Sequence, residues 1–478
     1  MGPPSISGAA AVPPAPNVPW KVPPGTVKPE PLITQATALA VPPDLAQRIQ
    51  QLSLADVVDL ALRNNPATRA SWAQARAAAD LLGSARGQYY PTIDGDVSVT
   101  RSKSPTTPGR TVSQETQYGP SVTLNWLLLD FGGRSGSVES ARQTMFATSL
   151  THNATLQNTV LQAESAYFNY MSTLALLGGE RSAIAEAQAN LTSAQQRYNV
   201  GLATIADVLQ AKTALSQEQL NLETIQGNLQ AARGGLAAAL GLPANLPFDL
   251  APLQTAIPVG SISQSVDTVI NAALRNRPDL AAARAQAAAA AARIRIARSA
   301  ELPSLNLGSN AARSYTRPQT SASGPSYNVT LGLSIPIFNG FSHQYEVGAA
   351  RATAEAFSAL ADQTRQQVVT EVFVSYYALQ TAEQRVATAD DLLKSAEQSM
   401  EVAAGRYREG VGSIIDVLTA QSALANARAQ QVQSRWQWYT ALAQLARDAG
   451  VLGVGGDTPF TITPDTLVSP TPPNTIRP

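Results

Sequence analysis

The chain has 478 residues, which is too long for a single compact core, so we expect two or more structural units. Its 34 Lys and Arg residues equal its 34 Asp and Glu residues, so no basic surplus favours nucleic acid as a partner. The absence of cysteine excludes disulfides, thiolate catalysis and thiolate metal sites, and the low aromatic content of 6% favours long, closely packed helices over a bulky core.

Both ends of the chain are rich in proline. Residues 1–43 hold twelve of the 32 prolines, so we expect an extended or disordered arm over residues 1–51, and we interpret the tail at 451–478 in the same way. No window of about eighteen residues is apolar enough for a transmembrane helix, and no secretory signal precedes the arm. From these features alone, the chain is either cytoplasmic or a mature or trimmed form.

The sequence is duplicated. "RYNVGLATIADVLQAKTAL" begins at Arg197 and "RYREGVGSIIDVLTAQSAL" begins at Arg406, and ten of the nineteen positions are identical at an offset of 209 residues. A period this long indicates two copies of one structural unit. We assign the copies to residues 52–240 and 261–450, with a proline-containing linker at 241–260 between them.

Each copy begins and ends with helix. The first helix is expected to start at a serine N-cap and to run without a break to the residue before Pro91 or Pro303, because a residue that precedes proline disfavours the α conformation. After the strands, about 134–196 and 343–405 contain no proline and permit a rod of roughly 95 Å at 1.5 Å per residue. A glycine-containing turn then leads into a helix that runs back along the rod.

Between these helices the hydrophobic period changes to two, which predicts one β-hairpin per copy, at about 91–131 and 303–338. Ser, Thr, Gly and Pro residues at 101–119 and 310–326 indicate loops between the strands. One strand face is aliphatic, while the other carries Asn, Thr, Ser and Asp. We assign the following residues of the aliphatic face to a lipid-facing surface: Val122, Leu124, Trp126, Val329, Leu331, Leu333 and Ile335.

Four strands per chain are too few to close a barrel, and an open sheet of this kind would expose its edges. We therefore expect several chains to join their hairpins into a membrane barrel with lipid outside and water inside; two or three chains would both close one. Aromatic residues near the strand ends indicate an interfacial girdle, although packing of helices on a small sheet explains them equally well. These residues are Tyr89, Tyr90, Tyr118, Trp126, Phe131, Tyr327, Phe338 and Phe341.

The repeated "RYxxGxxxxxDVLxAxxAL" motif, together with the hairpins and long helices, resembles the TolC-type outer-membrane efflux channels of Gram-negative bacteria over about residues 52–450. The resemblance implies a mainly α fold with a β-barrel portion, in which a homotrimer forms a twelve-stranded outer-membrane barrel that continues into an α-helical periplasmic tunnel. It implies as partners a periplasmic adaptor protein, an inner-membrane transporter of the RND, ABC or MFS kind, and outer-membrane lipid. We expect no enzyme activity, no cofactor, no metal and no nucleic acid.

The same resemblance places the repeated motif at the periplasmic tip of the tunnel. It assigns Asp207, Tyr407 and Asp416 to a gate with an acidic constriction, although plain helix capping explains the two aspartates equally well. Gly412 and Thr419 stand where the family pattern offers an arginine and an acidic residue, so we expect a less acidic constriction. Arg197 and Arg406 are expected to support the turns. The turns that would contact the adaptor contain Val200, Gly201, Leu202, Gly410, Val411 and Gly412.

The expected function is that of a passive exit duct for drugs and other toxic small molecules. Two alternatives stay open: the outer-membrane component of a type I protein secretion system, which differs only in cargo, and a soluble coiled-coil scaffold with a small β-head. The aliphatic strand face argues against the scaffold. Some relatives are lipoproteins with an N-terminal cysteine, and its absence fits either a member without the anchor or a chain in which that cysteine has been replaced.

Overall fold

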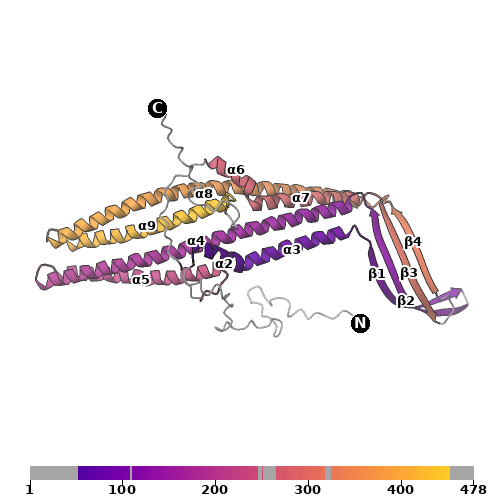
Figure 1. The fold of residues 1–478 in the computed structure, drawn as a ribbon, viewed down its shortest axis with the longest axis horizontal. Helices are drawn as coiled ribbons and strands as arrows, with labels where there is room; N and C mark the ends of the chain where they lie inside the picture. Colours follow the sequence, from indigo (N-terminus) through magenta and orange to yellow (C-terminus); the bar gives the residue numbers. More distant parts are fainter. Residues whose placement is uncertain (1–51, 108–109, 246–249, 251–264, 318–323, 453–478) are drawn as a thin grey trace, which may run out of the picture.

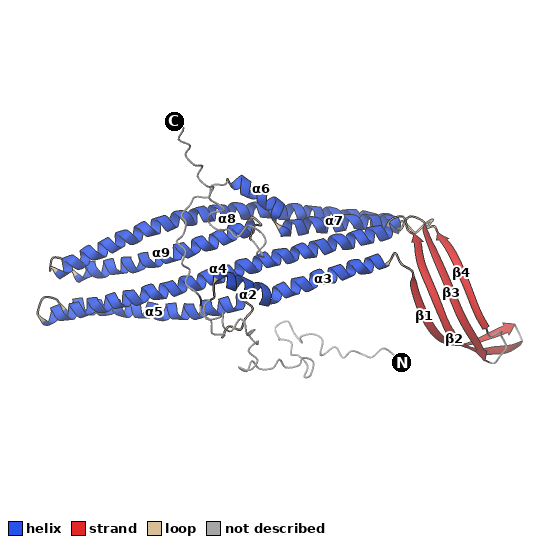
Figure 2. Cartoon of the chain, viewed as in Figure 1, coloured by secondary structure: helices blue, strands red, loops and turns tan. Residues whose placement is uncertain are grey.

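The computed structural model describes residues 52–107, 110–245, 250, 265–317 and 324–452. Within these residues the helices lie lengthwise in a long rod, and one sheet stands at an end of the rod (Figures 1 and 2). The arm expected at 1–51 lies outside the described residues, as do most of the expected linker and all but the first two residues of the expected tail.

Both copies of the duplicated unit contain the same elements in the same order. The first copy contains α2 (Leu54–Asn64), α3 (Pro66–Gly87), β1 (Thr92–Thr107), β2 (Arg110–Leu129), α4 (Gly133–Asn199) and α5 (Ile205–Ala239). The second contains α6 (Val266–Asn276), α7 (Pro278–Ser299), β3 (Ser304–Arg317), β4 (Gly324–Ser334), α8 (Ser342–Arg408) and α9 (Ile414–Asp448). Corresponding helices have 11, 22, 67 and 35 residues in both copies, so the structure repeats what the sequence repeats.

The first helix of each copy is broken in two. Asn65 lies between α2 and α3 with ψ 126°, and Arg277 lies between α6 and α7 with ψ 120°, so both residues are extended rather than helical. Each stands directly before a proline, Pro66 or Pro278, that occupies the first position of the next helix. The unbroken helix expected up to Pro91 is therefore wrong, because the residue before a proline leaves the α region while the proline itself favours a helix start.

The four strands form one antiparallel sheet in the order β1-β2-β3-β4, so the two copies pair with each other through β2 and β3. The strands are longer than expected. The first hairpin continues through most of the loop predicted at 101–119, and β3 reaches Arg317. The loop prediction is wrong because these stretches are mostly polar and show no apolar alternation, although threonine, which they contain, has a high β propensity.

The last strand ends earlier than expected. β4 ends at Ser334, and Ile335 lies beyond it although it was assigned to the lipid-facing strand. Pro336 follows, and proline has no N–H to donate to a strand ladder, which explains why pairing stops here.

The helices pack around α4, which contacts α3, α5, α7 and α9, while α8 contacts α7 and α9. The largest buried side chains lie at the middle of the rod, where the short helices α2 and α6 pack on α4 and α8. Elsewhere the buried positions are mostly alanine, which lets the helices approach closely over many turns. Among the helices that the structure describes, none combines the length and hydropathy needed to cross a membrane.

A cluster of ion pairs stabilises the second copy at the junction between α6 and α7. The Arg277 side chain, only 3% exposed, donates to Glu371 at 2.6 Å and to Asp279 at 2.5 Å, and it lies 3.8 Å from Asp448. The corresponding residue of the first copy is the neutral Asn65, whose Nδ2 donates to the backbone carbonyl of Ala239 at 3.3 Å. The same helix junction is therefore stabilised by charged groups in the second copy and by a neutral hydrogen bond in the first.

Candidate functional site

The two helical hairpins, α4 with α5 and α8 with α9, turn at the end of the rod opposite the sheet (Figure 1). Each turn contains a glycine with a left-handed backbone, Gly201 at φ 78° and Gly410 at φ 76°. At both turns a backbone N–H returns to the last turn of the preceding helix, from Leu202 to the carbonyl of Arg197 at 2.8 Å in the first hairpin. This helix-ending motif requires the left-handed residue, which explains the glycine in both copies of the sequence motif.

Asp207 and Asp416 both cap the returning helices. The backbone N–H of Thr204 donates to Oδ2 of Asp207 at 2.7 Å, and the backbone N–H of Ser413 donates to Oδ2 of Asp416 at 3.2 Å. Each aspartate in turn donates its own N–H to the hydroxyl of the cap residue, which completes a capping box. The hydrogen bonds from Ser413 hold the pKa of Asp416 below its usual value. The capping interpretation of these aspartates is therefore confirmed.

Arg197 crosses from one hairpin to the other. Its Nη1 donates to the backbone carbonyl of Tyr407 at 2.9 Å and to that of Arg408 at 3.3 Å, and its guanidinium carbon lies 4.7 Å from the centre of the Tyr407 ring. Burial raises the pKa of Tyr407; the charge of Arg197 lowers it and that of Asp207 raises it. The structure thus brings Tyr407 together with Asp207 and Arg197, while Asp416 stays with its own turn.

The same positions differ between the two hairpins. Tyr407 is 9% exposed, whereas Tyr198, its counterpart, is 45% exposed. Arg406, the counterpart of Arg197, is likewise exposed. The contact is therefore made once within the chain, from the first hairpin to the second. Tyr198 and Arg406, the residues that would make it a second time, are exposed.

The turns expose apolar side chains. Val200, Leu202 and Val411, three of the residues assigned to the adaptor contact, are each 69% exposed. Gly412 is closely surrounded: a Cβ at this position would lie 3.0 Å from Cβ of Arg406 and 3.1 Å from the backbone nitrogen of Tyr407. The arginine that the family pattern offers at this position would have to displace these neighbours.

The strand register separates the sheet into an apolar and a polar face. Leu124 pairs with Ile93 and Ser309, and Leu331 pairs with Leu307, which in turn pairs with Trp126. Because paired residues of antiparallel strands lie on the same face, six of the seven residues assigned to the lipid-facing surface share one face of the sheet. They are Val122, Leu124, Trp126, Val329, Leu331 and Leu333.

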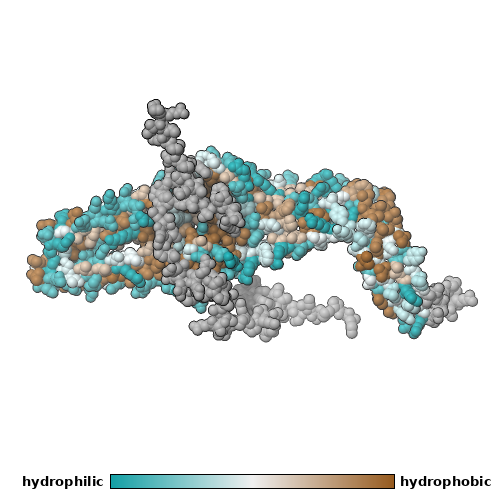
Figure 3. All heavy atoms as spheres, in the orientation of Figure 1, coloured by the Kyte–Doolittle hydropathy of each residue, from teal (hydrophilic) through white to brown (hydrophobic). Residues whose placement is uncertain are grey.

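Aromatic residues bound this apolar face at both ends. Trp126 lies near the helices, where its Nε1 donates to the backbone carbonyl of Tyr89 at 3.0 Å. Tyr118 lies eight residues earlier in β2, about 27 Å away along the strand, and stacks on Tyr315 with ring centres 5.5 Å apart. The next pair on this face, farther from the helices, is Thr116 with Arg317, so Arg317 lies on the same face. Figure 3 shows hydrophobic residues on the surface where the sheet meets the helices.

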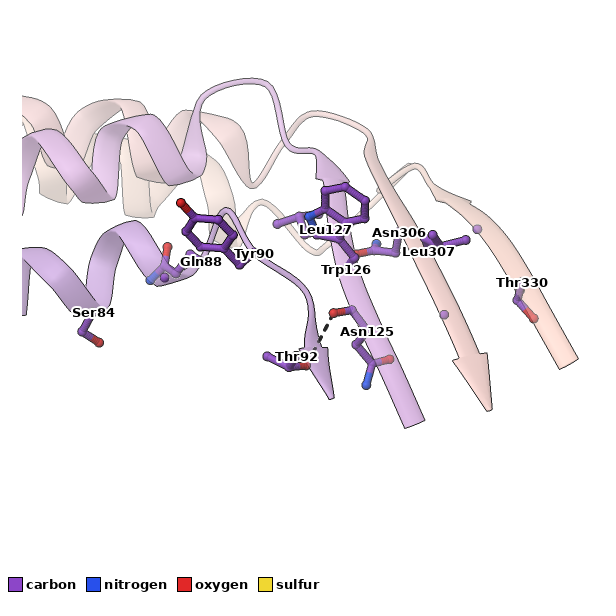
Figure 4. Close-up of a pocket in the computed structure, with 13 residues that line it drawn as sticks. Ser84, Gln88, Tyr90, Thr92, Asn125, Trp126, Leu127, Asn306, Leu307 and Thr330 are labelled. Atoms are coloured by element: carbon purple, nitrogen blue, oxygen red, sulfur yellow. Dashed lines mark hydrogen bonds between the residues drawn. The ribbon is translucent and has the colours of Figure 1, made fainter. Parts of the chain in front are cut away.

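The polar face carries short hydroxyl and amide side chains. One row across the sheet consists of Asp94, Thr123, Asn310 and Asn328, and Nδ2 of Asn310 donates to Oγ1 of Thr123 at 3.0 Å. A cavity of about 740 Å³ opens on this face at the junction with α3, and none of its lining residues carries a charge. Figure 4 shows Thr92 from β1, Asn125 from β2, Asn306 from β3 and Thr330 from β4 around it.

No group of three or more potential metal-ligating side chains occurs among the residues that the structure describes. Nδ1 of His152 on α4 lies 2.8 Å from the hydroxyl oxygen of Ser71 on α3.

The family profile described as "Outer membrane efflux protein" matches residues 57–242 and 269–451. Protein CyaE of Bordetella pertussis is 30% identical over 424 residues, which cover 87% of this chain and 88% of that protein. The solvent efflux pump outer membrane protein SrpC of Pseudomonas putida is 24% identical over 418 residues, covering 85% and 88%. The outer membrane protein VceC from Vibrio cholerae shares the fold, with a TM-score of 0.74 at 20% identity over 84% of this chain and 97% of that chain.

Proposed function

The chain belongs to the outer membrane efflux protein family, and on that premise we propose that three copies of it form the outer-membrane exit duct of a tripartite efflux system. The observation that carries this proposal is the open four-stranded sheet with one apolar and one polar face. The outer strands β1 and β4 each have one edge that pairs with no strand in the described part of the chain. Three copies would pair these edges into a closed barrel of twelve strands, which leaves no edge unpaired.

The apolar face turns outward toward lipid. Trp126 and Tyr118 are about 27 Å apart along the strand, which at a strand tilt of about 40° spans roughly 21 Å of the membrane normal. This distance is comparable with the roughly 25 Å height of the apolar band in such barrels. Arg317 lies beyond the outer aromatic level, where a charged side chain reaches water. The row from Asp94 to Asn328 then lines the lumen, so hydrated cargo passes hydroxyl, amide and carboxylate groups.

The helices form a tunnel on the periplasmic side. α4 and α8 have 67 residues each, which corresponds to about 100 Å at 1.5 Å per residue. Transport through the duct is passive, because the energy comes from an inner-membrane pump. The pump is of the RND, ABC or MFS kind, and a periplasmic adaptor contacts the exposed apolar turns at Val200–Leu202 and Gly410–Gly412.

The tips close against one another through arginines. Within one copy, Arg197 of the first hairpin binds the end of α8. Around a trimer the hairpins alternate, so Arg406 of each copy reaches the end of α4 in the next, where Tyr198 is exposed. Asp207, Tyr407 and Asp416 keep the gate role assigned from the sequence, with the two aspartates fixed in place by their caps. Small toxic molecules are the preferred cargo, since SrpC is named for solvent efflux.

The native mass in detergent and a cross-linking experiment test this assembly. Three copies of 50.1 kDa should give a particle of about 150 kDa of protein. The chain has no cysteine, so Tyr198→Cys with Arg406→Cys provides a thiol pair without background. A short bis-maleimide should link these cysteines between copies, whereas the pair Arg197→Cys with Tyr407→Cys should react within one copy. A monomer of about 50 kDa, or no link between copies from the first pair, would refute the proposal.

A further inference from the structure

The seam between α4 and α5 contains two carboxyl groups at core positions. The apolar residues of this seam recur at alternating intervals of three and four, as in a coiled coil. On α4 the series is Leu177, Glu180, Ile184, Ala187, Leu191 and Ala194, and on α5 it is Val208, Ala211, Leu215, Glu218 and Leu222. Glu180 and Glu218 therefore occupy positions at which the pattern calls for apolar side chains.

The second hairpin shows what the same layer contains without the carboxyl groups. At the offset of 209 residues, Glu180 corresponds to Ala389 and Glu218 corresponds to Ala427. Both alanines are buried, in the seam between α8 and α9. The corresponding layer thus contains two alanines in the second hairpin and two glutamates in the first. Because the second hairpin forms without them, the glutamates are not needed to form the hairpin.

The two carboxyl groups lie against each other. Glu218 is 9% exposed, and its Oε2 accepts from Nδ2 of Asn221 at 3.0 Å. Oε1 of Glu180 is shielded from solvent and receives no hydrogen bond while both carboxyl groups are ionised. Burial, a hydrogen bond with Glu218 and the charge of Glu218 raise the pKa of Glu180 to about 7, only partly opposed by Asn221. A proton held between the carboxyl groups would satisfy this arrangement, since a carboxylate alone can only accept hydrogen bonds.

Neighbouring charged groups do not neutralise the pair. Arg428 on α9, the other helix that packs against α4 here, binds Glu186 at 2.9 Å. Arg181 on α4 and Lys212 on α5 are exposed, and none of these three cations contributes to the pKa shift of Glu180. The ionised pair therefore lacks a compensating positive charge.

The helix α4 is also less stable next to Glu180. Gly178 and Gly179 directly precede Glu180 inside the 67-residue α4, and a Cβ at either position would meet nothing within 4 Å. No close packing requires glycine at either position, whereas each glycine costs about 1 kcal/mol of helix stability relative to alanine. The second hairpin has Ala387 and Thr388 here instead.

We propose that the layer of Glu180 and Glu218, with the adjoining Gly178–Gly179 pair, is a pH-sensitive joint in the first hairpin, about 28 Å above its tip. With one proton shared between the carboxyl groups the seam is closed. When that proton leaves, two like charges face each other in a half-buried layer and the seam opens locally at the glycines. The segment from Glu180 to the tip then moves relative to the rest of the tunnel, while the second hairpin stays rigid.

The direction of the pH effect follows from the raised pKa. A carboxyl group whose folded pKa is about 7 and whose usual value is 4.5 weakens the closed seam as pH rises between these values. The joint is therefore tightest below pH 4.5 and loosest above pH 7. Each pKa unit corresponds to a tenfold change in the closing equilibrium, so the shift sets an upper bound of about two orders of magnitude, and solvent around the partly exposed Glu180 reduces the effect below this bound.

Amide hydrogen exchange on the full-length protein in detergent tests the joint, without any need for transport. Peptides from residues 178–218 report on the first hairpin, and peptides from 387–427 serve as the control within the same molecule. After correction for the intrinsic pH dependence of exchange, the protection of 178–218 should fall by up to about two orders of magnitude between pH 5 and pH 8. Protection of 387–427 should stay constant.

Matched variants come from the chain itself. Glu180→Ala with Glu218→Ala installs the layer of the second hairpin and should remove the pH dependence from 178–218. Ala389→Glu with Ala427→Glu should confer it on 387–427. Glu180→Gln keeps the size of the side chain and should reduce the pH dependence, which provides a test if the double variant fails to fold. An equal pH response of both hairpins, or a response that survives Glu180→Gln or the double alanine substitution, would overturn the proposal.

Discussion

Arg197, in the last turn of α4, donates a hydrogen bond from Nη1 to the backbone carbonyl of Tyr407, 2.9 Å away and 210 residues later in the chain. The last carbonyls of a helix have no partners within it and carry the negative end of the helix dipole. An arginine from one hairpin thus completes the end of a helix in the other. The same side chain covers the Tyr407 ring, so one residue fixes both the spacing and the rotation of the two tips.

Removing this arginine should loosen the tips. Arg197→Ala takes away the hydrogen bonds to two carbonyls and should weaken the junction by about 1–2 kcal/mol, given that Arg197 is half-buried. In planar bilayers the variant should show a higher single-channel conductance or longer open times. Arg181→Ala, which removes an exposed arginine from the same helix, is the control and should behave as the wild type. If Arg197→Ala conducts as the wild type does, the contact does not restrain the channel.

The fold was largely predictable from the sequence because its signals are local and repeated. The offset of 209 residues identified the duplication, and the absence of proline identified α4 and α8. The serine N-cap expected for the first helix is confirmed at Ser53, whose hydroxyl accepts from the N–H of Asp56 at 3.3 Å. The signal for the break at Asn65–Pro66 is equally local, because the rule that ends a helix before Pro91 also applies to the residue before Pro66.

The site was less predictable because it depends on contacts between distant segments. Nothing in the motif around Arg197 indicates that its side chain crosses to the second hairpin, since the corresponding motif around Arg406 leaves that arginine exposed. The carboxyl layer does leave a signal: Glu180 and Glu218 interrupt a seam whose counterparts are alanine. That signal appears only when the two copies are aligned along the whole helix and the seam residues are known.

The two capping aspartates allow the charge of the tip to be separated from its structure. Asp207→Asn with Asp416→Asn keeps side-chain oxygens that can accept from the cap residues but removes both charges. If the charges form an acidic constriction, this double variant should lose cation preference in planar bilayers while amide exchange at the start of α5 and α9 stays slow. Asp207→Ala with Asp416→Ala should in addition accelerate that exchange and raise the conductance. Unchanged conductance and cation preference in both double variants would show that these residues are caps only.

The ion-pair cluster around Arg277 should be sensitive to the loss of one member. Arg277→Ala removes the buried guanidinium that donates to Asp279, while Arg447 still pairs with Glu371 and Asp448. It should destabilise the protein by about 1.5–3 kcal/mol, seen as a lower thermal midpoint. Arg63→Ala breaks a pair in which both side chains are exposed and should cost less than about 0.5 kcal/mol. Equal effects of the two substitutions would contradict this assignment.

The pH dependence of the same cluster has a definite sign. Burial favours a raised pKa for Asp279, but the hydrogen bond and charge of Arg277 outweigh it and hold the pKa below its usual value. A carboxylate of this kind contributes stability above its unfolded pKa of about 3.8, and the contribution is lost as pH falls through the lowered folded value. The gap in thermal midpoint between the wild type and Arg277→Ala should therefore narrow below about pH 3.8.

Neighbouring residues of β2 distinguish the two faces of the sheet. Val122 is on the apolar face, midway between Trp126 and Tyr118, and Thr123 is on the polar face, opposite Asp94. An arginine that faces lipid near the middle of the membrane costs about 2–4 kcal/mol per copy, while one that faces a water-filled lumen costs little. Val122→Arg should therefore prevent trimers from accumulating in the outer-membrane fraction. Thr123→Arg should assemble normally but lower the conductance for cations, because three positive charges enter the lumen. Normal assembly of Val122→Arg together with failure of Thr123→Arg would mean that the sheet faces lipid with its polar side, and the proposed barrel would be wrong.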